Sequence, residues 1–295
     1  MNEVQRPQIS VLIPVWNGEG HIAKCLEALA GQTLGRDRFE VIVVDNGSTD
    51  RTVGIVQGYD FVRLLHEATP GAYSARNRAL AEAIGDYIAF TDADCVPEPD
   101  WLEQALAAAA SNPDAGVLAG EVALFRACPG DSRTCAAYEQ FFTLDQAAYA
   151  QAGRCATANW ISSADVLRQL GGFDSSLKSG GDFEFASRIA ASGRPVVYCP
   201  NVLVRHPTRG GIRDALAKRL RVHGGRWMLR RHRITERQFA LQTLKDGIWQ
   251  SVLVSRSARL DRLMKLRVIL LIALLTAASV LEQARMLLGG SPRRA

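Results

Sequence analysis

Short apolar runs alternate with amphipathic stretches over the first 125 residues. Four of these runs are rich in β-branched residues and lead into turn residues. They predict buried strands at Ile9–Val15, 41–44, 61–65 and Tyr87–Phe90. Between the strands, helical spacing of apolar residues predicts helices over 19–30 and 74–84. This alternation predicts an α/β fold with a mostly parallel sheet flanked by helices.

The expected helix ends follow from single residues. Gly85 is a plausible stop for the helix over 74–84. Ser48, Thr49 or Asp50 can cap the helix that follows the second strand. Pro99 is expected to open an alanine-rich helix.

A further strand is predicted at Val117–Phe125, and after it the pattern becomes less regular. The remaining apolar segments predict helices over 135–150, 164–170 and 182–192, and strands at 157–161, 196–199 and 202–204. From Arg209 onward the pattern indicates helices only. We therefore expect an α/β domain over 1–208 and a helical C-terminal region over 209–295, with no internal repeat.

One segment of the helical region is unusually apolar. Residues 268–281 form a run of 14 without a charge, about 21 Å long as a helix and short of the roughly 30 Å core of a bilayer. The whole apolar helix, 264–288, includes Lys265, Arg267, Glu282 and Arg285. Contact with an anionic membrane face, lying on it or crossing it, is one interpretation. A buried helix or a dimer seam is the other.

Composition supports a globular protein with two chemically different regions. The 295 residues are 47% hydrophobic and 22% charged, which excludes disordered and collagen-like classes. Residues 201–295 contain 17 Arg and 3 Lys against 5 acidic residues, whereas residues 1–200 have 15 basic and 25 acidic residues. The acidic region suits a cation, and the basic region suits phosphates or lipid head groups.

Cysteine spacing and the N-terminal segment indicate the cellular compartment of the protein. The six cysteines lack CxxC or zinc-type spacing, so we expect free thiols in a reducing compartment and no metal bound by them. Residues 1–8 are polar and show no secretory signal. The catalytic part is therefore expected in the cytoplasm.

Four polar clusters lie where predicted elements end, at 14–17, 45–50, 92–94 and 180–184. Ligands of such sheets bind beyond the carboxyl ends of the strands. The carboxylates of Asp92 and Asp94 can converge on one hard cation such as Mg²⁺ or Mn²⁺. Asp182, where a glycine-rich loop enters a helix, can act as a general base. Taken singly, these motifs are also typical of turns and helix N-caps.

In their order and spacing, these segments resemble the inverting family 2 glycosyltransferases of the GT-A (Rossmann-like) fold. The resemblance covers residues 8–208 and rests on 10–17, 43–50, 75–77, 92–102, 171–174 and 181–184. It implies transfer of a sugar, a hexosyltransferase reaction, from a nucleotide-diphosphate donor with a divalent metal. UDP-sugar is the default donor. The acceptor would be a saccharide or a lipid-linked glycan in cell-surface polysaccharide synthesis.

The resemblance also implies roles for individual residues. Asp94 would hold the metal, and Asp182 would be the catalytic base. The donor would contact a larger set: Pro14, Trp16, Asn17, Glu19, Asp45, Asn46, Arg76, Asp92 and Ala93. His206 is a candidate further metal ligand, because imidazole is competent for Mn²⁺.

Acceptor contacts are expected from Asp174, Glu184, Arg226 and Trp227. The last two lie in a His223-Gly-Gly-Arg-Trp segment that is similar to the QxxRW motif of processive members, with His in place of Gln. This departure leaves processivity open. A solvated basic helix with one core Trp is the alternative interpretation.

Two other functions compete with the glycosyltransferase. A nucleotidyltransferase on a similar sheet would need a glycine- and lysine-rich phosphate loop, and residues 14–20 contain no basic residue. A nucleic-acid- or membrane-binding protein on a degenerate glycosyltransferase fold would use the arginine-rich helices, although no nucleic-acid motif accompanies them. The favoured hypothesis is an enzyme at the inner face of the cell membrane, attached peripherally or by a single C-terminal helix, with no nucleic-acid partner.

Overall fold

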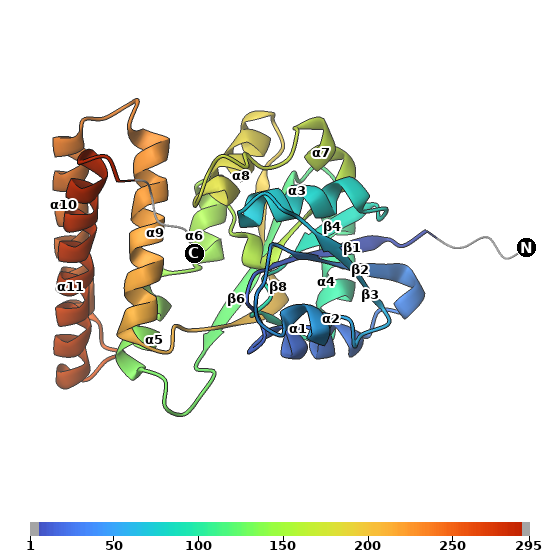
Figure 1. The fold of residues 1–295 in the computed structure, drawn as a ribbon, viewed down its shortest axis with the longest axis horizontal. Helices are drawn as coiled ribbons and strands as arrows, with labels where there is room; N and C mark the ends of the chain where they lie inside the picture. The colour runs from blue at the N-terminus through green and yellow to red at the C-terminus, as the bar shows by residue number, and fades with distance from the viewer. Residues whose placement is uncertain (1–5, 291–295) are drawn as a thin grey trace, which may run out of the picture. The chain divides into compact units, whose positions relative to one another are not determined.

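The computed structural model describes residues 6–290 and divides the chain into two compact units (Figure 1). The first contains Met1–Ala123, Leu144–Ser176 and Gly181–His206, and the second contains Leu124–Thr143, Leu177–Gly180 and Pro207–Ala295. The ends of the two predicted regions, 1–5 and 291–295, lie outside the described residues.

An eight-stranded sheet forms the centre of the first unit, in the order β3-β2-β1-β4-β7-β6-β8-β5. The strands are β1 (Ile9–Val15), β2 (Phe39–Asp45), β3 (Val62–His66), β4 (Tyr87–Phe90), β5 (Val96–Pro97), β6 (Val117–Phe125), β7 (Trp160–Ser163) and β8 (Val196–Pro207). The first four pair in parallel, and β7 pairs antiparallel with β4 and β6. The predicted α/β class is confirmed, and the sheet is mixed, with antiparallel pairs beside the parallel ones.

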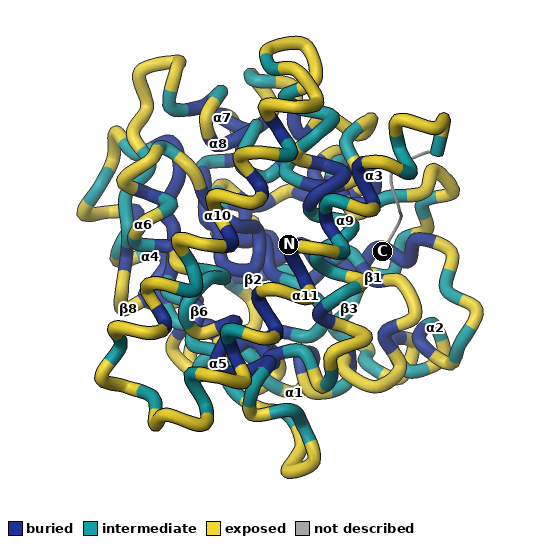
Figure 2. The backbone as a smooth tube through the Cα atoms, turned by 90° about the vertical axis from the view of Figure 1, so that its left-hand side faces the viewer, coloured by how far each residue is buried: buried dark blue, intermediate teal, exposed yellow. Residues whose placement is uncertain are grey.

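Helices cover both faces of this sheet (Figure 1). They are α1 (Ile22–Ala30), α2 (Thr52–Val56), α3 (Ala72–Glu82), α4 (Trp101–Ser111), α6 (Gln146–Gln151), α7 (Ala164–Gln169) and α8 (Gly181–Ala191), with short 3-10 turns at Arg36–Arg38 and Thr157–Asn159. Alternate residues of β1 and β2, such as Val11 and Val41, pack in one core with α1 and α4. Because side chains of a strand alternate between faces, the intervening positions face α3. Figure 2 shows the central strands as buried.

Aromatic rings on one face fix the position of α8. Phe173 contacts Phe90 of β4 and Phe185 of α8, with ring centroids 5.2 and 4.9 Å apart. Trp160 of β7 stacks on Phe185 at 5.8 Å. The packed rings hold the first turn of α8, and with it Asp182, against the sheet.

Several element boundaries differ from the sequence prediction. The single helix expected over 135–150 is two helices, α5 (Arg133–Phe142) and α6, separated at Leu144, which has a φ of 55°. Residues 157–159 are a 3-10 turn instead of a strand, and 196–204 belong to one strand, β8. The cap of α2 is Arg51, although the Asp50 carboxylate does accept from the Thr52 N–H at 3.0 Å.

The second unit contains four helices: α5, α9 (Ile212–Arg230), α10 (Glu236–Arg256) and α11 (Arg262–Leu287). The expectation that only helices follow Arg209 is confirmed for the described residues. Helix α11 packs against the other three helices. Their shared core contains Tyr138, Ala215, Val254 and Leu271, one from each helix. At Gly247 of α10, an added Cβ would come within 2.5 Å of Thr276 of α11, so these two helices approach closely.

Residue 85 is restricted to glycine by close packing, and not by the end of a helix as expected. Helix α3 ends with Ala83 as its C-cap. A Cβ at Gly85 would lie 2.6 Å from the Ser10 backbone nitrogen and 2.8 Å from the Ile9 carbonyl carbon. Glycine is therefore needed because the chain passes directly over the backbone of β1.

We expect Gly85→Ala to lower the free energy of unfolding by about 2–3 kcal/mol, because rigid backbone atoms must move apart. The matched control is Gly54→Ala, at an exposed helical position with no atom within 4 Å of the added Cβ. This control should stabilise by about 0.5–1 kcal/mol. Urea unfolding of both variants checks the prediction, and equal midpoints for the two would contradict it.

Candidate functional site

The loop after β1 is tied to the loop after β2 by side-chain hydrogen bonds. The Asn17 Oδ1 accepts from the Thr49 N–H at 2.8 Å, and the backbone N–H of Asn17 donates to the Ser48 Oγ at 2.9 Å. The Glu19 carboxylate accepts from the N–H of Arg51 at 3.1 Å. These contacts bring the predicted clusters 14–17 and 45–50 together. Pro14 is partly buried beside them, while Trp16 is 43% exposed.

Asp45 and Asn46 end β2 and are both buried. The Asp45 carboxylate accepts from the N–H groups of Gly47 and Ser48, at 3.2 and 3.1 Å, and lies 3.4 Å from the His66 Nδ1. The Asn46 amide donates to the carbonyls of residues 67 and 69 and accepts from the Gly71 N–H. Asn46 thus holds together the loop that leads into α3.

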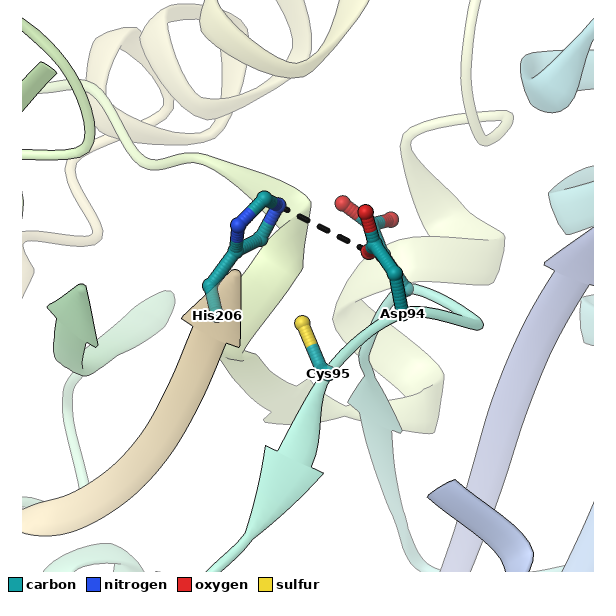
Figure 3. A group of neighbouring side chains, drawn as sticks. Asp94, Cys95 and His206 are labelled. Carbon is teal, nitrogen blue, oxygen red and sulfur yellow. Dashed lines mark ion pairs between the residues drawn. The ribbon is translucent and has the colours of Figure 1, made fainter. Parts of the chain in front are cut away.

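Among the described residues, one group of side chains that could hold a metal ion combines three residues after β4 with His206 of β8. One ligand atom from each of Asp92, Asp94, Cys95 and His206 lies within 4.8 Å of the others. The His206 Nε2 is 3.6 Å from the Asp94 Oδ1 (Figure 3). Ala93 lies between the two carboxylates in sequence and packs on the core. Carboxylate and imidazole ligands fit Mn²⁺. Burial raises the pKa of the Cys95 thiol and so disfavours the thiolate, which is the form that binds metals.

Strand pairing explains how His206 reaches this group from far along the chain. Val96 of β5 pairs antiparallel with Arg205 of β8. In this register the next residue outward on each strand is Cys95 on one and His206 on the other. The expectation that no cysteine binds a metal considered only spacing along the sequence. The structure places the Cys95 thiol beside both Asp94 and His206 (Figure 3).

Arg76 is a buried cation on α3 beside the acidic group. Its guanidinium contacts the Asp92 carboxylate at 2.5 Å, and its side chain is only 5% exposed. The Arg76 Nε has no hydrogen-bond acceptor among the described residues. A buried N–H without an acceptor carries a desolvation cost, which an added anion would remove.

Asp182 lies in the first turn of α8, and not at its N-cap, because the helix begins at Gly181. The buried Tyr73 hydroxyl is 3.3 Å from the Asp182 Oδ1 and accepts from the Gly181 N–H at 2.9 Å. A Cβ on Gly181 would lie 2.8 Å from the Tyr73 ring. Burial raises the pKa of Asp182, and the Arg76 charge opposes this rise. The half-buried carboxyl group is therefore a stronger base than an exposed aspartate.

Comparison with known proteins identifies the family. A model of the family "Glycosyl transferase family 2" matches residues 10–171. The chain is 33% identical over 244 residues to glycosyltransferase AglE of Haloferax volcanii, covering 80% of this chain and 79% of that protein. This protein belongs to glycosyl transferase family 2. It is also 30% identical over 224 residues to the pre-mycofactocin glycosyltransferase of Mycobacterium tuberculosis, of which it covers 45%.

Solved structures confirm the GT-A fold of this family 2 glycosyltransferase. The mannosyltransferase PcManGT from Pyrobaculum calidifontis, in complex with GDP-Man and Mn²⁺, has a TM-score of 0.57 at 21% identity. The match covers 97% of this chain and 77% of that one. S. aureus TarS 1-349 in complex with UDP-GlcNAc has a TM-score of 0.57 at 20% identity, covering 89% of this chain and 70% of that one.

The four residues expected to contact the acceptor lie on an exposed loop, on α8 and on α9. Asp174 is exposed and accepts from the Ser176 N–H. Glu184 pairs with Arg188, one turn later on α8, at 2.9 Å. Arg226 and Trp227 belong to α9 in the second unit, where the Trp227 ring lies 5.3 Å from that of Phe239.

Sequence reasoning missed two side chains of this candidate site, Tyr73 and Cys95. Tyr73 lies one turn before Arg76 on α3, so the two share a helix face. Extending the predicted helix 74–84 by one residue would have placed that aromatic side chain beside Arg76. Cys95 is adjacent to the Asp92–Asp94 motif, but its side-chain direction follows from the β5–β8 pairing.

Proposed function

We propose that this protein is a metal-dependent, inverting glycosyltransferase that moves a sugar from a nucleotide-diphosphate donor to a saccharide or lipid-linked acceptor. The observation that carries the proposal is the arrangement of Asp92, Asp94 and His206 beside the buried Arg76, with Asp182 held in the same unit. The chemistry would then reside in the predicted domain 1–208.

In this proposal the donor occupies the carboxyl ends of β1, β2 and β4. Asp45 and Asn46 lie at the base of the nucleoside site, bounded by the loop that contains Pro14, Trp16, Asn17 and Glu19. Arg76 contacts the diphosphate, because its unpaired Nε needs an anionic acceptor. The solved relatives hold GDP-Man or UDP-GlcNAc. We take the UDP-sugar as the default donor.

Asp94 and His206 are the proposed ligands of a divalent metal, Mn²⁺ or Mg²⁺. Asp92 is a proposed donor contact, and its ion pair with Arg76 places it beside the residue that contacts the diphosphate. A metal bound there stabilises the charge that develops on the departing diphosphate. The binding of Mn²⁺ by PcManGT supports this choice.

Asp182 is the proposed general base. A sugar hydroxyl is a weak nucleophile, so a carboxylate within hydrogen-bond reach must remove its proton during attack. The displacement occurs in line and from the side opposite the leaving diphosphate, which inverts the anomeric carbon. The raised pKa of Asp182 matches this role, since a stronger base accepts a proton more readily. Asp174, Glu184, Arg226 and Trp227 remain proposed acceptor contacts.

A thermal-shift screen tests the donor site. UDP, GDP, dTDP and CDP are each added with and without Mn²⁺, because a ligand of the folded state raises the melting temperature. Metal-dependent stabilisation by one nucleotide, followed by sugar transfer from the corresponding sugar nucleotide, is the expected result. No stabilisation together with no turnover would favour a binding protein on a degenerate fold.

Tyr73→Phe is expected to shift the pH profile of this enzyme. Loss of the hydroxyl removes a donor to the Asp182 carboxylate, which raises the pKa of Asp182 further. The acidic limb of kcat should move to higher pH, with kcat at alkaline pH almost unchanged. Tyr59→Phe, which loses a phenol hydrogen bond to Ala23 elsewhere in the unit, is the control. Identical profiles for the two variants would contradict the prediction.

We place the enzyme at the inner face of the cell membrane, with its acceptor in cell-surface glycan synthesis. The basic second unit supports this location, because arginine-rich surfaces are attracted to anionic lipids. One helix, α11, is long and apolar enough to cross a bilayer, with a mean hydropathy of 2.1 over its most apolar window. Attachment could thus be peripheral or through that helix alone.

A further inference from the structure

Large apolar side chains are exposed on both α10 and α11 of the second unit. On α10, Leu244, Ile248 and Trp249 are 44%, 66% and 61% exposed. On α11, Leu270, Leu274 and Leu281 are 61%, 45% and 71% exposed, at the spacing of one helix face. In the described part of the first unit, only Trp16 and Ile84 among large apolar residues are comparably exposed. The apolar surface is therefore concentrated on these two helices, which we call the α10–α11 hairpin.

The opposite side of α11 is anchored inside the helical unit by polar contacts. The Arg219 Nε of α9 donates to the Ser279 Oγ at 3.0 Å, and the Gln283 Nε2 donates to the Glu236 carbonyl of α10 at 2.7 Å. Ser279, Gln283 and Glu282 are all at least 97% buried. Moving α11 alone into hydrocarbon would break these contacts and leave polar groups without partners, which is costly there.

Helix α10 is also unsuited to crossing a bilayer. Lys245 and Asp246 are exposed at its middle, between the exposed apolar residues Leu244 and Ile248. Charges at the centre of a span are strongly disfavoured, whereas a helix lying in the interface keeps its charged side chains in water. Both helices therefore match a position parallel to a membrane surface.

The charged residues beside the hairpin indicate which kind of surface it would contact. Residues 256–267, which join α10 to the start of α11, contain five basic residues and one acid, Asp261. The Asp261 carboxylate is already used as the N-cap of α11, accepting from the Met264 N–H at 2.8 Å. An anionic bilayer neutralises such a cluster, whereas a second copy of this chain would add its own basic cluster.

We propose that the α10–α11 hairpin is an in-plane membrane anchor, which inserts its exposed apolar side chains into an anionic lipid surface without crossing it. This inference rests on the proposed membrane location of the enzyme and specifies how the protein is attached to the membrane. It adds α10 to the contact, and it assigns α11 to the interface instead of a transmembrane position. The apolar side chains supply burial, and the basic residues at 256–267 supply the preference for anionic head groups.

The test is flotation of the full-length protein with vesicles of phosphatidylcholine alone or mixed with phosphatidylglycerol. The wild type should float with the anionic vesicles only, less so in high salt, and alkaline carbonate should release it. Ile248→Asp and Leu270→Asp should each reduce the bound fraction about tenfold. Ile84→Asp, at an exposed apolar position in the first unit, should float like the wild type. Unchanged circular dichroism of all three variants checks folding.

Several outcomes would overturn the anchor. Resistance of the wild type to carbonate would indicate a span, and normal flotation of both hairpin variants would place the contact elsewhere. Absence of flotation, with dimers that Ile248→Asp converts to monomers, would assign the surface to a second copy of the chain.

Activity separates this inference from the proposed function. The hairpin variants should release nucleoside diphosphate in detergent at the wild-type rate, while Asp94→Ala should float normally with strongly reduced turnover. Failed flotation with intact turnover therefore contradicts only the anchor. Intact flotation without any turnover in the wild type contradicts only the transferase.

Discussion

Asp182→Asn is expected to lower kcat for sugar transfer by about 1,000-fold, because the amide cannot accept the proton of the acceptor hydroxyl. The substitution retains the shape of the side chain, and its amide oxygen can still accept from the Tyr73 hydroxyl. Affinity for the donor nucleotide should therefore change little. Steady-state kinetics at saturating donor and a thermal shift with the preferred nucleotide measure the two effects separately.

Stability provides a control for this variant, because its expected change has a known sign. The folded-state pKa of Asp182 is raised by burial, so the ionised carboxylate is less favourable in the folded protein than in the unfolded chain. Above the unfolded-state pKa this carboxylate destabilises the fold, and below it the protonated form removes the cost. At neutral pH the Asp182→Asn protein should thus melt at the same temperature as the wild type or higher.

Wild-type transfer by Asp182→Asn would exclude Asp182 as the base. Loss of transfer with a lower melting temperature and no nucleotide binding would mean that the residue supports the fold. The pH profile of the wild type gives an independent check. Its kcat should fall as the pH decreases through the raised pKa of Asp182, at a higher pH than for an ordinary aspartate.

Much of the first unit could be predicted because its signals are local. The strands Ile9–Val15 and Tyr87–Phe90 match the predicted bounds, since buried parallel strands read as continuous apolar runs. The carboxylates of Asp45, Asp92 and Asp94 follow strand ends, so their gathering at one edge followed from the sheet topology. The break at Leu144 lacked such a signal, because no glycine or proline marks it.

The remainder of the candidate site depends on pairing between distant segments. His206 reaches Asp94 only through the antiparallel register of β5 and β8, in which Val96 lies opposite Arg205. A shift of one residue in that register would turn His206 to the other face of the sheet. No periodicity in the sequence specifies this register, because β5 has only two residues.

In the helical unit, too, the sequence predicted the elements but not their packing. Its apolar helix was evident from hydropathy, and the structure gives its bounds as Arg262–Leu287. Which face of α11 is buried depends on contacts with three other helices. Ser279 and Glu282 look like interruptions of an apolar run in sequence, but they are buried among polar partners. Exposure of α10 could not be anticipated, since Leu241, Leu244, Ile248 and Val252 recur at a helical spacing that is typical of a buried face.

Asp94→Ala is expected to abolish metal-dependent stabilisation by the donor nucleotide and to lower kcat/KM by about 100-fold or more. A metal that polarises the leaving diphosphate contributes several kcal/mol to transition-state stabilisation, and each tenfold change in rate corresponds to about 1.4 kcal/mol. Treatment of the wild type with a chelator should have the same effect, and added Mn²⁺ should reverse it only in the wild type.

Asp92→Ala and His206→Ala distinguish the metal site from a general requirement for acidic side chains. Asp92 is paired with Arg76, whereas Asp94 lies beside His206. If Asp94 and His206 hold the metal, His206→Ala should raise the Mn²⁺ concentration needed for half-maximal activity, and Asp94→Ala should not respond to added Mn²⁺. Asp92→Ala should mainly raise KM for the donor, because it frees Arg76 from its partner and disturbs the position of the phosphates. Equal metal dependence in all three variants and the wild type would instead show that these side chains do not hold the metal.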